Sequence, residues 1–172
     1  MQKAIFNIQT EQEFNKIALE VFKHQFTNNK VYRSFCDLLY VHPSDVKTVE
    51  QIPFLPIQFF KTHRILSGNK NPVITFESSG TTGSITSKHL VIDISVYKES
   101  YLKGFTHFYG NIEEYVVLAL LPNYLERKGS SLVFMVDDLI SKSKNQESGF
   151  YLHNLEELAQ KLIKLDKNGQ KT

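Results

Sequence analysis

The sequence predicts an α/β fold in which a helical lead-in precedes a mostly parallel sheet flanked by helices. Apolar residues recur at helical spacing over residues 1–50, whereas strand-like and helix-like segments alternate over residues 51–172. A nearly continuous apolar run, Val116–Leu121, is typical of a strand that is buried on both faces of a parallel sheet. With 172 residues, of which 41% are hydrophobic, the chain is long enough for a domain with its own core. We therefore expect a single domain over residues 1–172.

Two helices are predicted in the lead-in. Residues 10–26 carry apolar side chains at helical period, and Thr10 and Glu13 have the spacing of a capping box. A second helix is expected over residues 29–40, before a proline breaks the pattern. Cys36, the one cysteine in the sequence, shares the apolar face of this helix, so we expect it to pack in the core rather than react.

The α/β portion is predicted to alternate short strands with helices. Residues 52–61 are twice interrupted by proline, which favours a short helical turn or an irregular crossing over a central strand. Strands are predicted over residues 63–66, 73–76, 88–92 and 115–121. Helices are predicted over residues 93–109, 130–141 and 154–165. This alternation is the pattern of a parallel sheet with crossover helices.

Composition and charge exclude several classes of function. The formal charge of +2 arises from 20 basic and 18 acidic residues that are spread along the chain, so we expect no nucleic-acid partner. No window approaches the roughly 18 apolar residues of a membrane helix, and the start lacks the apolar core of a signal peptide. Together with the single cysteine, these features favour a cytoplasmic location. The six histidines show no close pair at zinc-ligand spacing, so no metal site of that kind is expected.

One loop, over residues 77–88, contains the residues that point to chemistry. It follows a predicted strand and combines glycine with hydroxyl side chains in the order Ser78, Ser79, Gly80, Thr81, Thr82 and Gly83. Glycine lets the backbone approach a ligand closely, so N–H groups and hydroxyls can converge on a phosphate. The order fits neither a Walker A loop nor a G-x-G-x-x-G fingerprint. A plain surface hairpin is the alternative interpretation of this composition.

Ser-Ser-Gly-Thr-Thr-Gly, followed by Lys88, resembles the glycine-rich signature of the adenylate-forming superfamily. The resemblance implies that Ser79–Gly83 hold the triphosphate of ATP, together with Mg²⁺, while a carboxylate attacks the α-phosphorus, and Ser78 adds a further hydroxyl donor to the predicted ATP site. It also implies the fold of part of the large N-terminal domain of these enzymes. The usual pattern has Pro-Lys soon after the second glycine, whereas residues 84–87 intervene here. Lys88 therefore either contacts phosphate or only begins the next strand.

The likeness extends over most of the chain. The segments Pro53–Ile57, Phe60–His63, Ser87–His89 and Leu121–Leu132 together resemble the acyl-protein synthetase component of bacterial fatty acid reductases, the LuxE family. The resemblance implies ATP-dependent activation of a carboxylic acid, a fatty acid in that family, as acyl-AMP. It further implies transfer of the acyl group to a cysteine, with an acyl-accepting or reductase protein as partner.

Other motifs of adenylate-forming enzymes have no counterpart in the sequence. These are the aromatic-Gly-x-Thr-Glu motif, the ribose-binding Asp and the catalytic Lys. We therefore expect an incomplete amino-terminal part of the enzyme that is inactive alone. Its catalytic residues and the acceptor thiol would lie beyond Thr172.

Five further residues are candidates for contacts with the substrate. His63 and His89 flank the loop in the sequence, and Tyr124, Glu126 and Arg127 follow the apolar strand, where open α/β sheets bind ligands. Polar packing is the alternative for the histidines, and a solvated ion pair at a turn is the alternative for the other three. Two rival functions stay open. One is a phenylacetate-CoA-ligase-like acyl-CoA ligase, and the other is a nucleotide- or acyl-binding module without turnover.

Overall fold

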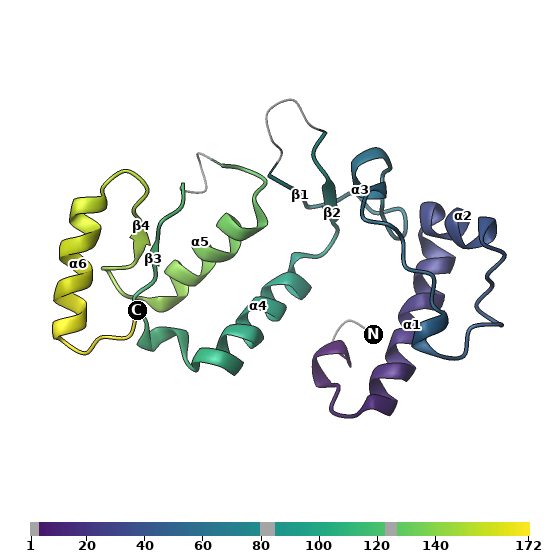
Figure 1. Cartoon of the computed structure of the whole chain (residues 1–172), viewed down its shortest axis with the longest axis horizontal. Coiled ribbons are helices and arrows are strands. Elements are labelled where there is room, and N and C mark those ends of the chain that lie inside the picture. The colour runs from purple at the N-terminus through teal and green to yellow at the C-terminus, as the bar shows by residue number, and fades with distance from the viewer. Residues whose placement is uncertain (1–3, 80–84, 123–126) are drawn as a thin grey trace. The chain divides into compact units, whose positions relative to one another are not determined.

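The computed structural model describes residues 4–79, 85–122 and 127–172 (Figure 1). The chain divides into two compact units, Met1–Val96 and Tyr97–Thr172. Helices dominate the first fifty residues, and short strands and helices alternate after them, so the fold is the mixed α/β one that the sequence predicts. The single domain over residues 1–172 stays a prediction, because two compact units can belong to one domain or to two.

The first long helix begins where the local sequence predicts it. A 3₁₀ turn, η1 (Ala4–Asn7), precedes α1 (Glu11–Asn28). Thr10 Oγ1 accepts a hydrogen bond from the Glu13 N–H at 3.2 Å, and the Glu13 carboxylate accepts one from the Thr10 N–H at 3.1 Å. This reciprocal pair confirms the predicted capping box, which satisfies two backbone donors that the end of a helix leaves unpaired.

One buried residue, Asn29, joins α1 to α2 (Lys30–Leu38). Its N–H donates to the Gln25 carbonyl at 2.8 Å, and its Oδ1 accepts from the Tyr32 N–H at 3.2 Å. Its backbone is extended, with φ −111° and ψ 104°, so the chain changes direction there. Since Asn29 bonds to α1 through its N–H and to α2 through its side chain, its burial costs little. The two helices then pack against each other.

The core of the first unit lies between α1, α2 and the chain that follows them. Its buried members are Phe22, Phe26, Tyr32, Cys36, Val46 and Ile52. Cys36 is 0% exposed, so the prediction that it packs in the core is confirmed. The Tyr32 hydroxyl donates to the Pro53 carbonyl at 2.8 Å, just after the 3₁₀ turn η2 (Val49–Gln51), and ties this segment to α2.

The strand predicted over residues 63–66 is wrong. The proline-interrupted segment leads into a short helix, α3 (Phe59–Thr62), and irregular chain follows it. The Ser67 hydroxyl donates to Gln25 Oε1 at 2.6 Å, so this stretch is anchored to α1. Two of its polar groups, the Ser67 hydroxyl and the Gly68 N–H, thus bond to α1 rather than to the edge of a sheet.

The first sheet is an antiparallel pair, β1 (Ile74–Glu77) and β2 (Lys88–Val91), in which Ile74 lies opposite Val91 and Glu77 opposite Lys88. The mostly parallel sheet that the sequence predicts is therefore not confirmed, because the described residues form two separate sheets of two strands each. The physical reason is the length of the connection. A parallel pair needs a crossover of a dozen or more residues, whereas this loop is shorter and suits a hairpin.

The second sheet, in the second unit, is parallel. It pairs β3 (Leu118–Ala119) with β4 (Gly149–Phe150), and Tyr115 forms a further parallel bridge with Lys171. The strand predicted over residues 115–121 is thus shorter than expected, but both its pairing with β4 and the bridge at Tyr115 are parallel. Val116, two residues before β3, is 1% exposed.

Four helical segments precede, separate or follow these two strands along the chain. They are α4 (Ile94–Tyr109), η3 (Ile112–Glu114), α5 (Ser131–Ser143) and α6 (Leu155–Lys167). Asp93 Oδ1 accepts from the Ser95 N–H at 2.9 Å at the start of α4, and Ser130 Oγ accepts from the Val133 N–H at 3.3 Å at the start of α5. Gly110, with φ +87°, ends α4 in a conformation that side chains disfavour. Among the described residues, no helix combines the length and apolar character needed to cross a membrane.

A carboxylate on α5 links that helix to α4. Asp138 accepts hydrogen bonds from the Tyr101 hydroxyl at 2.7 Å and from Lys98 Nζ at 3.1 Å, and Lys142 Nζ lies 3.8 Å away. The Asp138 side chain is 16% exposed. Burial alone would raise its pKa, but the hydrogen bonds and the two lysine charges outweigh burial and hold the pKa below its ordinary value.

Candidate functional site

The loop predicted to bind phosphate lies between β1 and β2, which pair as antiparallel strands (Figure 1). Gly80, Thr81, Thr82 and Gly83 lie outside the described residues, and their predicted phosphate contacts stay predictions. Ser78, Ser79 and Lys88 are described. The site is therefore built from the two ends of the loop and from the elements that hold them.

Two hydrogen bonds join the ends of the loop at Ser78 and Ser87. The Ser78 N–H donates to the Ser87 carbonyl at 3.1 Å, and the Ser87 N–H donates to Ser78 Oγ at 3.0 Å. In a hydrogen-bonded antiparallel pair, two residues exchange two backbone bonds. Here the side-chain oxygen of Ser78 takes the place of its own carbonyl in one of them. Both residues lie one position beyond the strands, where the ladder ends.

Lys88 begins β2 and lies beside Glu77, its partner in the register. The two charged groups form an ion pair with a distance of 4.0 Å between Lys88 Nζ and Glu77 Oε1. Their side chains are 61% and 47% exposed, so the pair contributes little, about 0–1 kcal/mol at most. One of the two alternatives for Lys88, that it begins the strand, is thus observed. A phosphate contact is compatible with it and stays a prediction.

His89 and His63 each stack on a phenylalanine of α3. The His89 ring lies 6.0 Å from that of Phe60 with the planes 6° apart, and the His63 ring lies 4.9 Å from that of Phe59 with the planes 24° apart. His63 Nδ1 is also 2.8 Å from Thr62 Oγ1. Both imidazoles are exposed, so their outer faces and edges stay accessible while the stacks fix their orientation. The structure brings these two histidines to the α3–β2 side of the hairpin.

The remaining predicted contacts belong to the second unit. Tyr124 and Glu126 lie outside the described residues, whereas Arg127 is described and exposed. Their contacts with the substrate stay a prediction. Lys61 and Arg64, which the sequence analysis did not single out, are exposed cations next to His63. Their adjacency to that histidine is a signal in the sequence that could have drawn attention to them.

The described ends of the loop suit an anion better than a metal ion. Ser78 and Ser79 are exposed hydroxyls at the end of β1, and Lys88 supplies a positive charge beside them. The Glu77 carboxylate, 4.0 Å from Lys88 Nζ, offsets part of that positive charge. Within residues 4–79, 85–122 and 127–172, no group of three or more His, Cys, Asp or Glu side chains could hold a metal ion.

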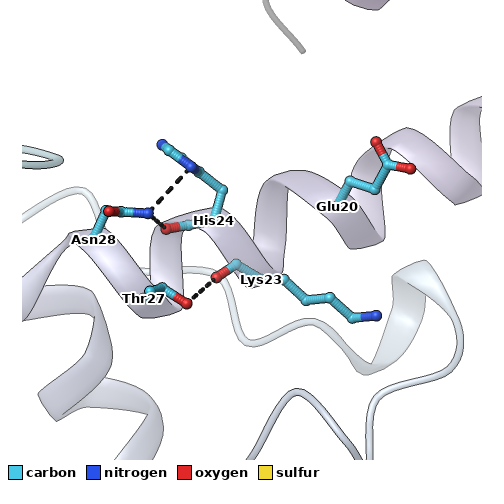
Figure 2. Close-up of a pocket in the computed structure, with 5 residues that line it drawn as sticks. All are labelled: Glu20, Lys23, His24, Thr27 and Asn28. Atoms are coloured by element: carbon cyan, nitrogen blue, oxygen red, sulfur yellow. Dashed lines mark hydrogen bonds between the residues drawn. The ribbon is translucent and has the colours of Figure 1, made fainter.

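A shallow depression on α1 lies apart from these residues. Figure 2 shows that its lining comes from one helix, and its volume is about 420 Å³ with a wide opening. The lining residues are Glu20, Lys23, His24, Thr27 and Asn28. Their polar groups bond mainly within the helix, as the Thr27 hydroxyl does with the Lys23 carbonyl at 2.9 Å. We assign no function to this depression, because a single solvated helix face offers no enclosed site.

The fold and the loop together define a class of protein. It is a mixed α/β protein with a hydroxyl- and glycine-rich loop between two antiparallel strands. A family model described as "Acyl-protein synthetase, LuxE" matches residues 4–113, which is more than half of the chain. The chain therefore belongs to the LuxE acyl-protein synthetase family, as its sequence motifs predict. The matched part contains the whole hairpin, α3 and both histidines, but not Arg127.

A curated relative agrees with this assignment. The long-chain-fatty-acid–luciferin-component ligase of Photorhabdus luminescens is 33% identical over 69 residues, which are 40% of this chain and 59% of that protein. The chain thus covers less than two thirds of that relative. No solved structure matches the chain.

Proposed function

We propose that this chain is the ATP-binding part of an acyl-protein synthetase that activates a carboxylic acid as acyl-AMP and passes the acyl group to a protein thiol. The observation that carries the proposal is Ser-Ser-Gly-Thr-Thr-Gly in the loop between β1 and β2, inside the part that the family model matches. The name of the Photorhabdus relative, which specifies a long-chain fatty acid, supports a fatty acid as the substrate class.

The proposed adenylation step requires the loop to bind and position the phosphates of ATP. A carboxylate oxygen forms a bond to the α-phosphorus of ATP, the bond from that phosphorus to the bridging oxygen breaks, and pyrophosphate leaves. In this proposal the hydroxyls of Ser79, Thr81 and Thr82 and the N–H groups at Gly80 and Gly83 donate hydrogen bonds to the β- and γ-phosphates. They position the phosphates and stabilise the charge that accumulates on the leaving pyrophosphate.

Mg²⁺ would supply further neutralisation of the phosphate charge. This ion keeps several waters and takes phosphate oxygens as ligands, so it needs only one or two oxygens from the protein. The hydroxyl-rich loop can provide them, which is why we propose ATP and Mg²⁺ together. Lys88 adds a point charge when its ammonium group exchanges the Glu77 carboxylate, at 4.0 Å, for a phosphate oxygen.

The other predicted residues have separate roles in the proposal. His63 and His89 contact the carboxylate or a phosphate with the ring edges that their stacks leave accessible. Tyr124, Glu126 and Arg127 face the nucleotide or the acyl group. The acyl-accepting thiol is not Cys36, because that side chain is fully buried and burial raises the pKa of its thiol, which disfavours the nucleophilic thiolate. The proposed acceptor is therefore a thiol outside these 172 residues.

Binding of MgATP to this chain, measured by titration calorimetry, tests the role of the loop. We expect binding to the wild-type chain and a loss of at least tenfold in affinity when Thr81→Ala and Thr82→Ala are combined, because two donors to phosphate disappear. Wild-type affinity in the double variant, or no binding by the wild type, would refute the assignment of the loop.

Exchange of labelled pyrophosphate into ATP, with acids from acetate to palmitate, tests the reaction. The chain lacks the adenine and catalytic-lysine motifs, so we expect its own turnover to fall far below the roughly 1 s⁻¹ of ordinary ligases. Acid-dependent exchange at that level would show that the chain is active alone. In a preparation that carries out the exchange, transfer of the acyl group from acyl-AMP to coenzyme A rather than to a protein thiol would favour the alternative function of an acyl-CoA ligase. ATP binding without exchange in any preparation would favour the binding module.

A further inference from the structure

We infer that Ser78 is a positioning residue that fixes the two ends of the phosphate loop, rather than a hydroxyl that binds phosphate. The inference rests on the proposed function, because a positioned loop matters only if the loop binds a ligand. It departs from the sequence motif, in which Ser78 and Ser79 are equivalent hydroxyls at the start of the loop. The structure distinguishes them.

The distinction comes from the hydrogen bonds of Ser78. Its backbone N–H donates to the Ser87 carbonyl at 3.1 Å, and its Oγ accepts from the Ser87 N–H at 3.0 Å. The two residues are nine positions apart in the sequence, so one serine contacts the far end of the loop with both its backbone and its side chain. Successive side chains of an extended chain point to opposite faces, so Ser79 does not share this orientation.

The neighbouring contacts explain why the last bond of the ladder matters. One position back, Glu77 and Lys88 are partners in the ladder, and their side chains form the exposed ion pair at 4.0 Å. Two positions back, Phe76 is buried and lies opposite His89, whose ring stacks on Phe60 of α3. The hairpin is thus firmly held at Phe76 and His89, and the Ser78–Ser87 bonds transmit that order to the beginning and end of the loop.

The consequence for ligand binding is entropic. When both ends of the loop are held in one geometry, Ser79 and Lys88 lose less conformational freedom on binding a ligand, so the affinity is higher. Removing the Ser78 hydroxyl leaves the exposed Ser87 N–H to water and loosens the ends. The Ser78 hydroxyl thus affects affinity indirectly, through its bond to the Ser87 amide. The rate of hydrogen exchange at that amide can be measured separately from affinity.

Three variants and two measurements test it. Ser78→Ala deletes the acceptor, Ser78→Thr keeps it, and Ser79→Ala deletes the adjacent hydroxyl. Hydrogen exchange of the Ser87 amide, followed by NMR, reports the bond itself, and calorimetry with MgATP reports affinity. For Ser78→Ala we expect about tenfold faster exchange at Ser87 and about fivefold weaker binding, and Ser78→Thr should restore both. Ser79→Ala should weaken binding and leave exchange at Ser87 unchanged.

Each other outcome has a definite meaning. Unchanged exchange in Ser78→Ala would overturn the inference at its geometric basis. Faster exchange with unchanged affinity would overturn the positioning role. If the wild-type chain binds no MgATP although its Ser87 amide is protected by Ser78, the proposed function fails, and the inference falls with it for that reason and not for a wrong hydrogen bond.

Discussion

Replacing Tyr101 by phenylalanine should destabilise the second unit through loss of one hydrogen bond. The Tyr101 hydroxyl donates to Asp138 Oδ2 at 2.7 Å, and the phenol is buried. A hydrogen bond to a charged group contributes about 1.5–3 kcal/mol. Asp138 keeps its bond to Lys98 at 3.1 Å, so the substitution leaves no unpaired carboxylate, and we expect a loss of about 2 kcal/mol in the free energy of unfolding.

Urea denaturation at pH 7, followed by circular dichroism, measures this loss. Tyr109→Phe is the matched control on the same helix, because Tyr109 is exposed and its change should stay within about 0.5 kcal/mol. A double-mutant cycle of Tyr101→Phe with Asp138→Asn should give a coupling energy of about 1 kcal/mol or more. A cost below about 0.5 kcal/mol for Tyr101→Phe, or no coupling, would refute the reasoning.

The pH dependence of the same loss provides a second check. The pKa of Asp138 is lowered in the folded state, so its ionised form adds stability that is present above the ordinary aspartate pKa of about 4. This contribution disappears as the pH falls through the lowered pKa. The cost of Tyr101→Phe should therefore shrink below about pH 4, because a neutral carboxyl accepts a weaker hydrogen bond. A cost that grows on acidification would contradict the assignment.

Three further predictions concern the first unit. Thr10→Ala should cost about 1 kcal/mol in urea denaturation through loss of the capping box, whereas Thr27→Ala, inside α1, should cost clearly less; equal costs would contradict the capping argument. Cys36 should react with a thiol reagent such as DTNB only when urea unfolds the chain, and reaction of the native protein within minutes would show that its burial is not maintained. Glu77→Gln should strengthen MgATP binding about two- to fivefold by releasing Lys88, and Lys88→Ala should weaken it, whereas opposite signs would exclude the proposed exchange of partners.

Local signals in the sequence predicted where several helices begin. Thr10 with Glu13, Asn29, Asp93 and Ser130 all satisfy backbone groups within three residues of themselves, so their roles depend on the local chain alone. The burial of Cys36 followed for a similar reason, because the apolar period of one helix indicates which face meets the core.

Pairing between strands was harder to predict. A strand needs a partner distant in the sequence, and composition does not identify that partner. Residues 63–66 have the composition of a strand, yet the stretch that they begin is bonded to α1 through Ser67. The short interval between β1 and β2 did contain the information that they form a hairpin.

The candidate site shows the same limit. The motif identified which loop to consider, and the family match confirmed the family to which that motif pointed. The motif could not distinguish the role of Ser78 from that of Ser79, because the difference depends on which residue lies opposite each serine in the hairpin. Likewise, the stacking of His89 on Phe60 joins two segments whose proximity no spacing rule predicts.

Asn29 makes the number of residues between α1 and α2 as important as their identity. Because this one residue ends the first helix and begins the second, a single inserted residue would turn α2 by about 100° about its axis if the helix started at its old place in space. Tyr32 and Cys36 would then leave the core. A one-residue insertion at this position would therefore remove part of the core of the first unit, whereas substitutions on the exposed faces of the two helices leave their register unchanged.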